Sequence, residues 1–239
     1  MKICLISPAK GSGCPPIGLV HLGTYIQSLG HRVDIIDYNY HTGQLPDSSY
    51  DLVGISAMTV HYSEAIEIAK KINQPVIIGG VHITTCPESF HPAFTSMVTG
   101  EGESAFKDLL VDFKAGNLLK QYKGKEMVLD DMPFPNWDLL DQRYFKPRLN
   151  TTFMEKGIEG WLMTSRGCPY KCRFCSTTQF WKTIRFHSPE YVGQLIINLK
   201  RKGCTHVQIW DDLFTMNMKR LRDIAPLMQR RDGNFPGTW

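Results

Sequence analysis

Short apolar runs alternate with stretches of helical periodicity along the first 113 residues of the chain. Three stretches carry apolar residues at helical spacing: Leu19 to Leu29, which Gly30 closes, Tyr62 to Ile72, and Gly100 to Phe113. Strands that alternate with helices form parallel sheets, so the pattern predicts an α/β fold with helices on both faces of a doubly wound parallel sheet. The predicted strands are Lys2–Ser7, Arg32–Asp37, Asp51–Ser56, Pro75–Ile78 and Ser96–Val98.

Small or polar residues follow the predicted strands. Ligands of such sheets bind beyond the carboxyl ends of the strands, and glycine permits a close approach of the backbone. Each of these segments alone is typical of a tight turn, but together they indicate one crevice. Gly11-x-Gly13 is not a dinucleotide fingerprint, because Pro16 stands where the third glycine belongs. The candidate ligand-binding residues are Ser56, Thr59, Gly79, Gly80, His82, Gly100 and Glu101.

A second set of alternating elements begins near residue 160. Gly160–Thr164 and Thr205–Trp210 predict strands, and Ser188-Pro189-Glu190 is typical of a helix start, here for a helix that runs to Lys202. Asn217–Arg230 predicts another helix, kinked or interrupted at Pro226. The second strand closes on Asp211 and Asp212, and carboxylates at the carboxyl end of a β/α-barrel strand lie on the catalytic face. An aspartate that caps the following helix is the alternative interpretation.

Three cysteines lie in the segment between these strands. The cysteine loop, Thr164 to Cys175, places Cys168, Cys172 and Cys175 in a C-x3-C-x2-C pattern directly after an apolar strand. Soft thiolate ligands select zinc, copper or iron–sulfur clusters. Structural zinc sites and ordinary cubane clusters use four protein ligands, whereas this loop offers three. The spacing therefore indicates a cluster with one iron open to an exogenous ligand.

At these residues the chain resembles the radical S-adenosylmethionine (SAM) superfamily, in which an aromatic residue, here Phe174, precedes the last cysteine. The resemblance implies that the three cysteines hold a 4Fe-4S cluster whose open iron binds SAM. It also implies that the reduced cluster cleaves SAM to methionine and a 5′-deoxyadenosyl radical. Phe174 would pack near the adenine, and Asp211 or Asp212 would position SAM. The expected partners are an electron donor such as flavodoxin or ferredoxin and an unknown small-molecule or peptide substrate.

The first part of the chain shows a second resemblance. Pro15-Pro16-Ile17-Gly18-Leu19, Gly79-Gly80-Val81-His82, Pro87-Glu88 and Gly100-Glu101-Gly102-Glu103 look like the cobalamin-binding domain of cobalamin-dependent radical SAM proteins. The D-x-H-x-x-G motif, whose histidine ligates cobalt in many cobalamin enzymes, is absent. The resemblance leaves two alternatives open: cobalamin without a protein histidine on the cobalt, or a domain that no longer binds it. His82 is either a contact to the corrin face or a structural histidine.

The two resemblances together predict a cobalamin-dependent radical SAM enzyme that methylates, cyclises or rearranges its substrate. The expected organisation is a cobalamin-binding-like domain over 1–129, a linker over 130–155, and the first part of a radical SAM β/α barrel over 156–239. Room for two strand–helix units after Gly160 indicates a truncated barrel. Two alternatives stay open: a corrinoid-binding module whose cluster does not cleave SAM, and a zinc-stabilised binding protein that takes Cys204 or His187 as the fourth ligand.

Composition restricts the class of protein and its expected cellular location. The chain has 239 residues, and 42% of them are hydrophobic and 21% charged, as in ordinary globular proteins. The apolar segment at the amino terminus is too short for a signal peptide, and no segment is long enough to span a bilayer. Seven cysteines, three of them in one loop, favour a metal site over a disulfide framework, and hence the cytoplasm. Residues 130–239 carry 17 basic and 11 acidic side chains, which we interpret as solvated helix faces rather than as a surface that binds nucleic acid.

Overall fold

A computed structural model describes residues 1–150 and 155–228 of the chain. The chain divides into two compact units. Unit 1 consists of Met1–Met127 and Met132–Asp141, and unit 2 of Val128–Asp131 and Gln142–Trp239.

Unit 1 contains a six-stranded sheet in the order β2-β1-β3-β4-β5-β6, in which every neighbouring pair is parallel. The five predicted strands are confirmed, with ends shifted by a residue or so, and the doubly wound α/β class is confirmed with them. A sixth strand on the edge was not predicted. The strands are β1 (Lys2–Ser7), β2 (Arg32–Asp37), β3 (Leu52–Ser56), β4 (Val76–Gly79), β5 (Ser96–Thr99) and β6 (Gln121–Lys123).

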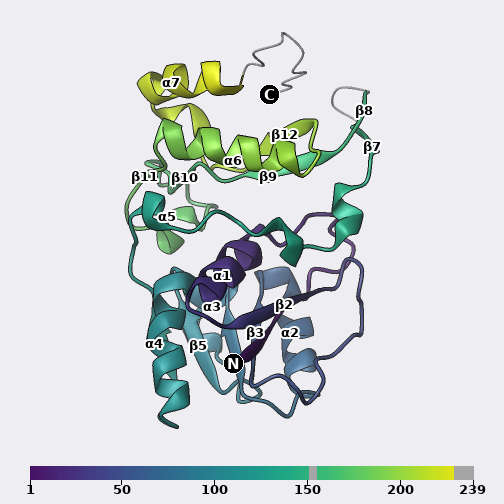
Figure 1. Cartoon of the computed structure of the whole chain (residues 1–239). Coiled ribbons are helices and arrows are strands. Elements are labelled where there is room, and N and C mark those ends of the chain that lie inside the picture. Colours follow the sequence, from purple (N-terminus) through teal and green to yellow (C-terminus); the bar gives the residue numbers. More distant parts are fainter. Residues whose placement is uncertain (151–154, 229–239) are drawn as a thin grey trace. The chain divides into compact units, whose positions relative to one another are not determined.

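Helices cover both faces of this sheet (Figure 1). Helices α1 (Ile17–Ser28) and α4 (Gly102–Lys114) pack on one face, and α2 (Tyr62–Ala69) and the short α3 (Val81–Thr85) pack on the other. Side chains alternate along a strand, so β1 supplies both cores: Ile3 and Leu5 face α1 and α4, while Cys4 and Ile6 face α2 and α3. Burial on both faces explains why these strands read as continuous apolar runs.

The strand order places a topological switch point between β1 and β3. The chain moves from β1 outward to β2 in one direction, and then to β3, β4 and β5 in the other. The loops that leave the carboxyl ends of β1 and β3 therefore diverge, and a crevice opens between them. The predicted ligand-binding residues after β3, β4 and β5 all lie at this edge of the sheet.

Unit 2 is built on two parallel strands, β9 (Glu159–Leu162) and β12 (His206–Ile209). Both are shorter than predicted, and Thr164 lies beyond the end of its strand. Helix α6 (Pro189–Arg201) starts as expected, because the Ser188 hydroxyl accepts a hydrogen bond from the Tyr191 backbone N–H at 3.2 Å. The remaining elements are β7 (Arg148–Asn150), β8 (Glu155–Gly157), β10 (Ser165–Arg166), β11 (Arg185–Phe186), α5 (Thr177–Phe180) and α7 (Met218–Met228).

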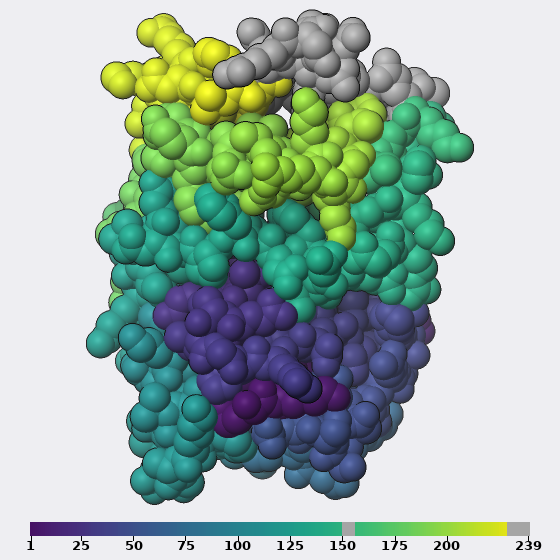
Figure 2. Space-filling model, in the orientation of Figure 1, coloured from purple at the N-terminus to yellow at the C-terminus, as the bar shows by residue number. Residues whose placement is uncertain are grey.

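Helix α7 packs along α6, and Figure 2 shows the yellow atoms of α7 against the green atoms of α6. A kink or an interruption of α7 is expected at Pro226; the interruption is wrong, because the helix continues through this residue to Met228, and the kink stays a prediction. The predicted end at Arg230 lies outside the described residues. Within the expected linker, 130–155, 3-10 helices and strand β7 form, and β8 begins at its last residue. The 3-10 helices of the described chain are Thr59–His61, Pro87–Ser89, Leu129–Asp131, Trp137–Leu139, Gln142–Phe145 and Phe214–Met216.

Candidate active site in the cysteine loop

The cysteine loop leaves the carboxyl end of β9 beside the carboxyl end of β12. The two strands run in register up to Leu162 and Ile209, and the Trp210 N–H donates to the Leu162 carbonyl at 2.8 Å. This register places Asp211 next to Thr164, the first residue of the loop. Because the strands are parallel, the cysteines and both aspartates lie at the edge where α/β proteins bind ligands.

The Asp211 carboxylate holds the first residues of the loop in place. It accepts hydrogen bonds from the Thr164 backbone N–H at 2.5 Å and from the Thr164 hydroxyl at 2.5 Å. The Ser165 hydroxyl also donates to it, at 2.6 Å. These three short bonds fix the direction in which the chain leaves β9. Asp211 therefore acts here by holding Thr164 and Ser165, through one backbone N–H and two hydroxyls.

Asp212 lies in a more open position. It is exposed and accepts from the Gly167 N–H at 3.3 Å and from the Thr177 hydroxyl at 3.1 Å. The same Thr177 oxygen accepts a hydrogen bond from the Cys175 thiol at 3.2 Å. A row of hydrogen bonds thus joins the last cysteine of the loop to the exposed carboxylate through one hydroxyl.

Arg220, a buried arginine of α7, fixes the same part of the chain from another direction. Its guanidinium donates to the Thr164 carbonyl at 2.7 Å and to the His187 carbonyl at 2.9 Å, and it lies 5.3 Å from the centre of the Phe186 ring. Burial lowers the pKa of Arg220, while the nearby Asp211 opposes that shift. Thr164 is therefore held at its N–H, hydroxyl and carbonyl by two charged residues that come much later in the sequence.

The three loop cysteines are free thiols, Cys172 exposed and the other two partly buried. Within the described residues no three His, Cys, Asp or Glu side chains converge on one point as a single metal ion requires. A cubane cluster does not need such convergence, since each thiolate binds a different iron. The hydrogen bond with Thr177 lowers the pKa of Cys175, which favours the thiolate that iron needs. Accessible thiols of this kind fit a cluster held by three cysteines.

Neither candidate for a fourth zinc ligand fits that role. Cys204 lies at the amino end of β12, opposite to the end from which the cysteine loop leaves β9, and burial raises the pKa of its thiol to about 12. Its sulfur lies 3.5 Å from the Glu159 carbonyl. His187 is buried, stacks on Tyr191 with ring centres 4.0 Å apart, and shares a 3.1 Å hydrogen bond with Asp130. These contacts count against the zinc-stabilised alternative.

Phe174 stands out because 93% of its side chain is exposed. It is flanked by Arg173, which is exposed, and by Cys175. An aromatic ring with so little protein contact is available to pack against a ligand, as the resemblance implies for adenine. That role, like the roles of the cysteines and of Asp212, stays a prediction.

In unit 1 the structure brings the predicted residues after β3 and β4 together. The Ala57 N–H donates to the Gly79 carbonyl at 3.1 Å, and the His82 N–H donates to the Ala57 carbonyl at 3.2 Å. Gly80 has φ +97°, and a Cβ atom there would lie 2.8 Å from the Ala57 backbone. Ser56 lies in the same turn, with its hydroxyl 2.9 Å from the position of that Cβ. The close approach of the two loops therefore requires glycine at this position.

His82 is buried, and both of its ring nitrogens have partners. Nδ1 lies 3.2 Å from the Thr59 hydroxyl, Nε2 lies 3.0 Å from the Ser89 hydroxyl, and the ring packs on Tyr62 at 4.0 Å between centres. In this arrangement neither nitrogen is free to bind cobalt. The geometry agrees with the structural interpretation of His82.

The remaining predicted residues of unit 1 lie after β5. The Gly100 N–H donates to the Thr84 hydroxyl at 3.1 Å, and φ at Gly100 is +77°. Glu101 is buried at the start of α4, with 3% of its surface exposed. Gly100 therefore shapes the turn at this edge, and the Glu101 side chain points into the protein rather than toward solvent.

Sequence reasoning missed three residues that shape these loops: Asn39, Thr177 and Arg220. After β2, the Asn39 side chain accepts from the Gly13 N–H at 3.1 Å and donates to the Cys14 carbonyl at 2.9 Å, which fixes the loop after β1. No periodicity marks such residues, because each acts through a contact with a distant segment. For Thr177, its place two residues after the last cysteine was the one available signal.

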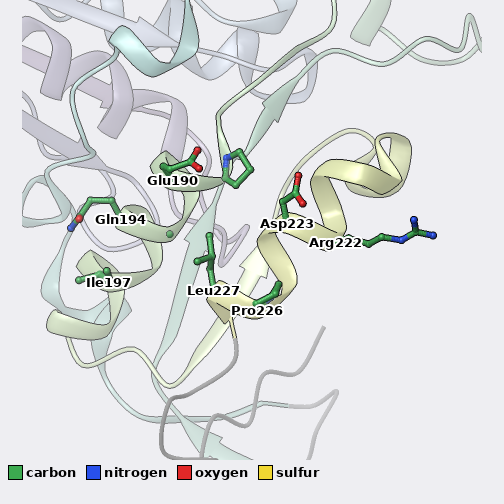
Figure 3. Close-up of a pocket in the computed structure, with 9 residues that line it drawn as sticks. Glu190, Gln194, Ile197, Arg222, Asp223, Pro226 and Leu227 are labelled. Atoms are coloured by element: carbon green, nitrogen blue, oxygen red, sulfur yellow. The ribbon is translucent and has the colours of Figure 1, made fainter.

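A shallow groove of about 600 Å³ lies between α6 and α7 (Figure 3). Figure 3 shows Ile197 and Leu227 along it, with Glu190 and Asp223 near one end. None of the predicted site residues lines this groove. It is a separate surface feature of unit 2.

Comparison with known proteins agrees with both parts of this description. The sequence matches the B12 binding domain family over residues 9–110 and the radical SAM superfamily over residues 162–237. Residues 9–110 therefore belong to the B12 binding domain family and residues 162–237 to the radical SAM superfamily, in this order along the chain. The alternative of a corrinoid-binding module whose cluster does not cleave SAM is not favoured.

Among curated proteins, the chain is 34% identical to an uncharacterised methyltransferase of Pyrococcus horikoshii, over 94% of this chain and 56% of that protein. It is 24% identical to the anaerobic magnesium-protoporphyrin IX monomethyl ester cyclase of Rubrivivax gelatinosus, over 97% of this chain and 49% of that protein. The radical SAM methyltransferase TsrM of Kitasatospora setae, solved with tryptophan and a SAM analogue, has a similar fold: the TM-score is 0.68 at 18% identity, over 95% of this chain and 50% of that one.

The chain thus spans about half the length of the curated relatives that it matches. In the part of the chain that the structure describes, no helix is both long and apolar enough to cross a lipid bilayer.

Proposed function

We propose that this chain provides the cobalamin-binding and cluster-binding parts of an enzyme that uses SAM to methylate or cyclise a small molecule. One observation carries the proposal: three accessible cysteines and the exposed Asp212 lie together at the carboxyl ends of two parallel strands. Methylation and ring formation are both considered, because the similar proteins include a methyltransferase and a cyclase.

The residues of unit 2 have separate roles in this proposal. Cys168, Cys172 and Cys175 would hold the 4Fe-4S cluster. When bound, this cluster supplies the electron that cleaves SAM, and cobalamin carries the methyl group in a methylation. Asp212 is the better candidate to bind the amino group of SAM, since it is exposed and its hydrogen bonds are 3.1 and 3.3 Å long. Asp211 is a positioning residue, because its carboxylate is occupied by the start of the loop.

The carboxyl edge of unit 1 would hold cobalamin. Apolar side chains are exposed there directly after β3, with Met58 50% and Val60 80% exposed, and such a surface fits the face of a macrocycle. Thr59 lies between them, and the Gly79–Gly80 turn adjoins them through Ala57. Because His82 is engaged on both nitrogens, we propose that cobalamin binds here without a histidine on the cobalt.

The proposal extends to partners and location. A cluster of this kind needs an external reductant, and a flavodoxin or ferredoxin in the cytoplasm is the expected donor. The exposed Lys171 and Arg173 of the cysteine loop would attract an acidic donor of that type. The identity of the small-molecule substrate is left to experiment.

Anaerobic reconstitution with iron and sulfide tests the proposal. We expect about four irons per chain and an EPR signal that changes when SAM is added. Cys172→Ala should lose the cluster, whereas Cys14→Ala, which removes an exposed cysteine of unit 1, should keep it. Release of 5′-deoxyadenosine under strong reductant separates SAM cleavage from a cluster that does not cleave SAM. Zinc in place of iron, or a cluster that does not respond to SAM, would refute the proposal.

Hydroxocobalamin added to the same samples tests unit 1. We expect a bound corrinoid spectrum without the signature of an axial nitrogen from the protein. His82→Gln should therefore leave the spectrum unchanged, while a change in the spectrum would show that His82 reaches the cobalt.

A further inference from the structure

The Thr177 hydroxyl lies between two groups of the proposed site. It is 3.2 Å from the Cys175 sulfur and 3.1 Å from the nearer Asp212 oxygen. A hydroxyl has one proton to donate and lone pairs to accept with. In the metal-free protein these needs agree: the thiol donates to Thr177, and Thr177 donates to the carboxylate.

Iron binding changes that balance. A cysteine that ligates iron is a thiolate, which accepts hydrogen bonds and cannot donate one. The single hydroxyl proton of Thr177 then has two acceptors within reach, the Cys175 sulfur and the Asp212 carboxylate. Asp212 has one other hydrogen bond among the described residues, a 3.3 Å contact with the Gly167 N–H. If the Thr177 proton turns to the Cys175 thiolate, Asp212 therefore keeps only this long bond.

We propose that Thr177 is a positioning residue that shares its hydroxyl proton between the Cys175 thiolate and Asp212, and so links the reduction potential of the cluster to the occupancy of Asp212. This inference rests on the proposed function. A cation bound at Asp212 satisfies the carboxylate, so the hydroxyl turns toward the sulfur. Hydrogen bonds to the sulfur ligands of a cluster favour its reduced, more negative form and raise its potential.

The link predicts an order of events at the site. With Asp212 free, the hydroxyl serves the carboxylate, and the cluster stays at the more negative potential. With the amino group of SAM on Asp212, the potential rises and the cluster accepts an electron more readily. Thr177 would thus favour reduction of the cluster when SAM is bound. It would also limit reduction of the cluster when SAM is absent.

Four single variants and one double variant of the full 239-residue chain, reconstituted anaerobically, test this inference. The readout is the midpoint potential of the cluster from an EPR-monitored titration, with and without SAM, after iron and sulfide analysis. Thr177→Val should lower the potential in the presence of SAM by about 59 mV, which corresponds to a tenfold loss in the stability of the reduced form relative to the oxidised one. Thr177→Ser keeps a hydroxyl and should behave as the wild type.

Thr178→Val is the matched control. Thr178 is the next residue of the same short helix, and in the part of the chain that the structure describes its hydroxyl bonds neither Cys175 nor Asp212. The cluster of Thr178→Val should have the same midpoint potential as the cluster of the wild type. The thermal unfolding of each metal-free variant shows whether the protein folds.

Asp212→Asn separates the shared proton from simple electrostatics. Asp212→Asn removes a negative charge near the cluster. If only this charge matters, the substitution raises the cluster potential by the same amount with or without Thr177, and the effects of the two substitutions add. If the two residues share one proton, the effects are not additive, and Asp212→Asn shifts the potential less in the Thr177→Val background.

The outcomes distinguish the inference from the proposed function. A cluster in Thr177→Val with the potential of the wild type, or additive effects in the double variant, overturns the role of Thr177 and leaves the proposed function intact. A folded Thr177→Val that loses the cluster, while Thr177→Ser and Thr178→Val keep it, supports a positioning role of the hydroxyl. Failure of the wild type to form a cluster overturns both.

Discussion

Replacement of the buried Arg220 by methionine is the most direct test of how the cysteine loop is held. Arg220 donates to the carbonyls of Thr164 and His187. The Thr164 carbonyl keeps a second donor in the variant, because the His187 N–H lies 3.0 Å away. Among the residues that the structure describes, no other donor reaches the His187 carbonyl, so this carbonyl would lose its hydrogen bond. The cost therefore comes mainly from one buried carbonyl.

An unsatisfied buried carbonyl costs about 1–3 kcal/mol, and the lost contact with the Phe186 ring adds about 0.5–1 kcal/mol. Methionine fills much of the arginine's volume and removes the cost of burying a charge, which offsets part of the loss. We expect a net loss of about 2 kcal/mol. With a denaturant dependence of 1–3 kcal/mol per molar urea, the midpoint for unit 2 should fall by about 1 M.

Tryptophan fluorescence during urea unfolding measures this change, because the buried Trp161 reports on unit 2. Arg222→Met is the control: Arg222 lies on the same helix but is exposed, so its replacement should change the stability by less than about 0.5 kcal/mol. Arg220→Lys keeps the charge but cannot hold both carbonyls in the same geometry. Its urea midpoint should lie between those of Arg220→Met and Arg222→Met. Equal midpoints for Arg220→Met and Arg222→Met would refute the reasoning.

Three further predictions concern other parts of the chain. Gly80→Ala should destabilise unit 1 by about 1–3 kcal/mol in urea unfolding, because φ is positive and the new Cβ meets backbone atoms at 2.8 Å; Gly18→Ala, with no atom within 4 Å, should not. Burial lowers the pKa of His187 to about 4, so the unfolded state binds more protons between pH 6.5 and 4. The unfolding free energy should fall by up to about 3 kcal/mol as the pH drops through this window, and a His187→Phe variant should lack this part of the slope. Iodoacetamide should label the three loop cysteines of the native, metal-free protein well before Cys4 and Cys204, whose pKa values burial raises to about 12; mass spectrometry that finds equal labelling would contradict the burial described here.

Local signals explain which parts of the fold could be predicted from the sequence. The strands of unit 1 are buried on both faces, so each is a continuous apolar run between turn residues. Helix α6 begins where Ser188 and Pro189 predict, because capping depends on neighbouring residues alone. Strand β6 could not be predicted, since it has three residues at the edge of the sheet and only Tyr122 is buried.

Some features of the candidate site could also be predicted from local sequence, and others could not. The spacing of the cysteines is a local feature, and it located the loop correctly beyond the carboxyl end of a strand. The difference between Asp211 and Asp212 is not local, because it depends on the register of β12 against β9 and on which donors of the loop reach each carboxylate. Two adjacent aspartates are equivalent in the sequence and become distinct only in the fold.

The contacts of Thr164 also have a consequence for the order in which the site forms during synthesis. The cysteines leave the ribosome before Asp211 and Arg220, which follow Thr164 by 47 and 56 residues. Until those residues emerge, the Thr164 N–H and hydroxyl lack their partner, and only the earlier segment around His187, whose N–H bonds the Thr164 carbonyl, can hold the start of the cysteine loop. We therefore expect that iron–sulfur assembly on this protein follows, rather than accompanies, the translation of α7, and that a chain stalled before Arg220 takes up metal without selecting a cluster.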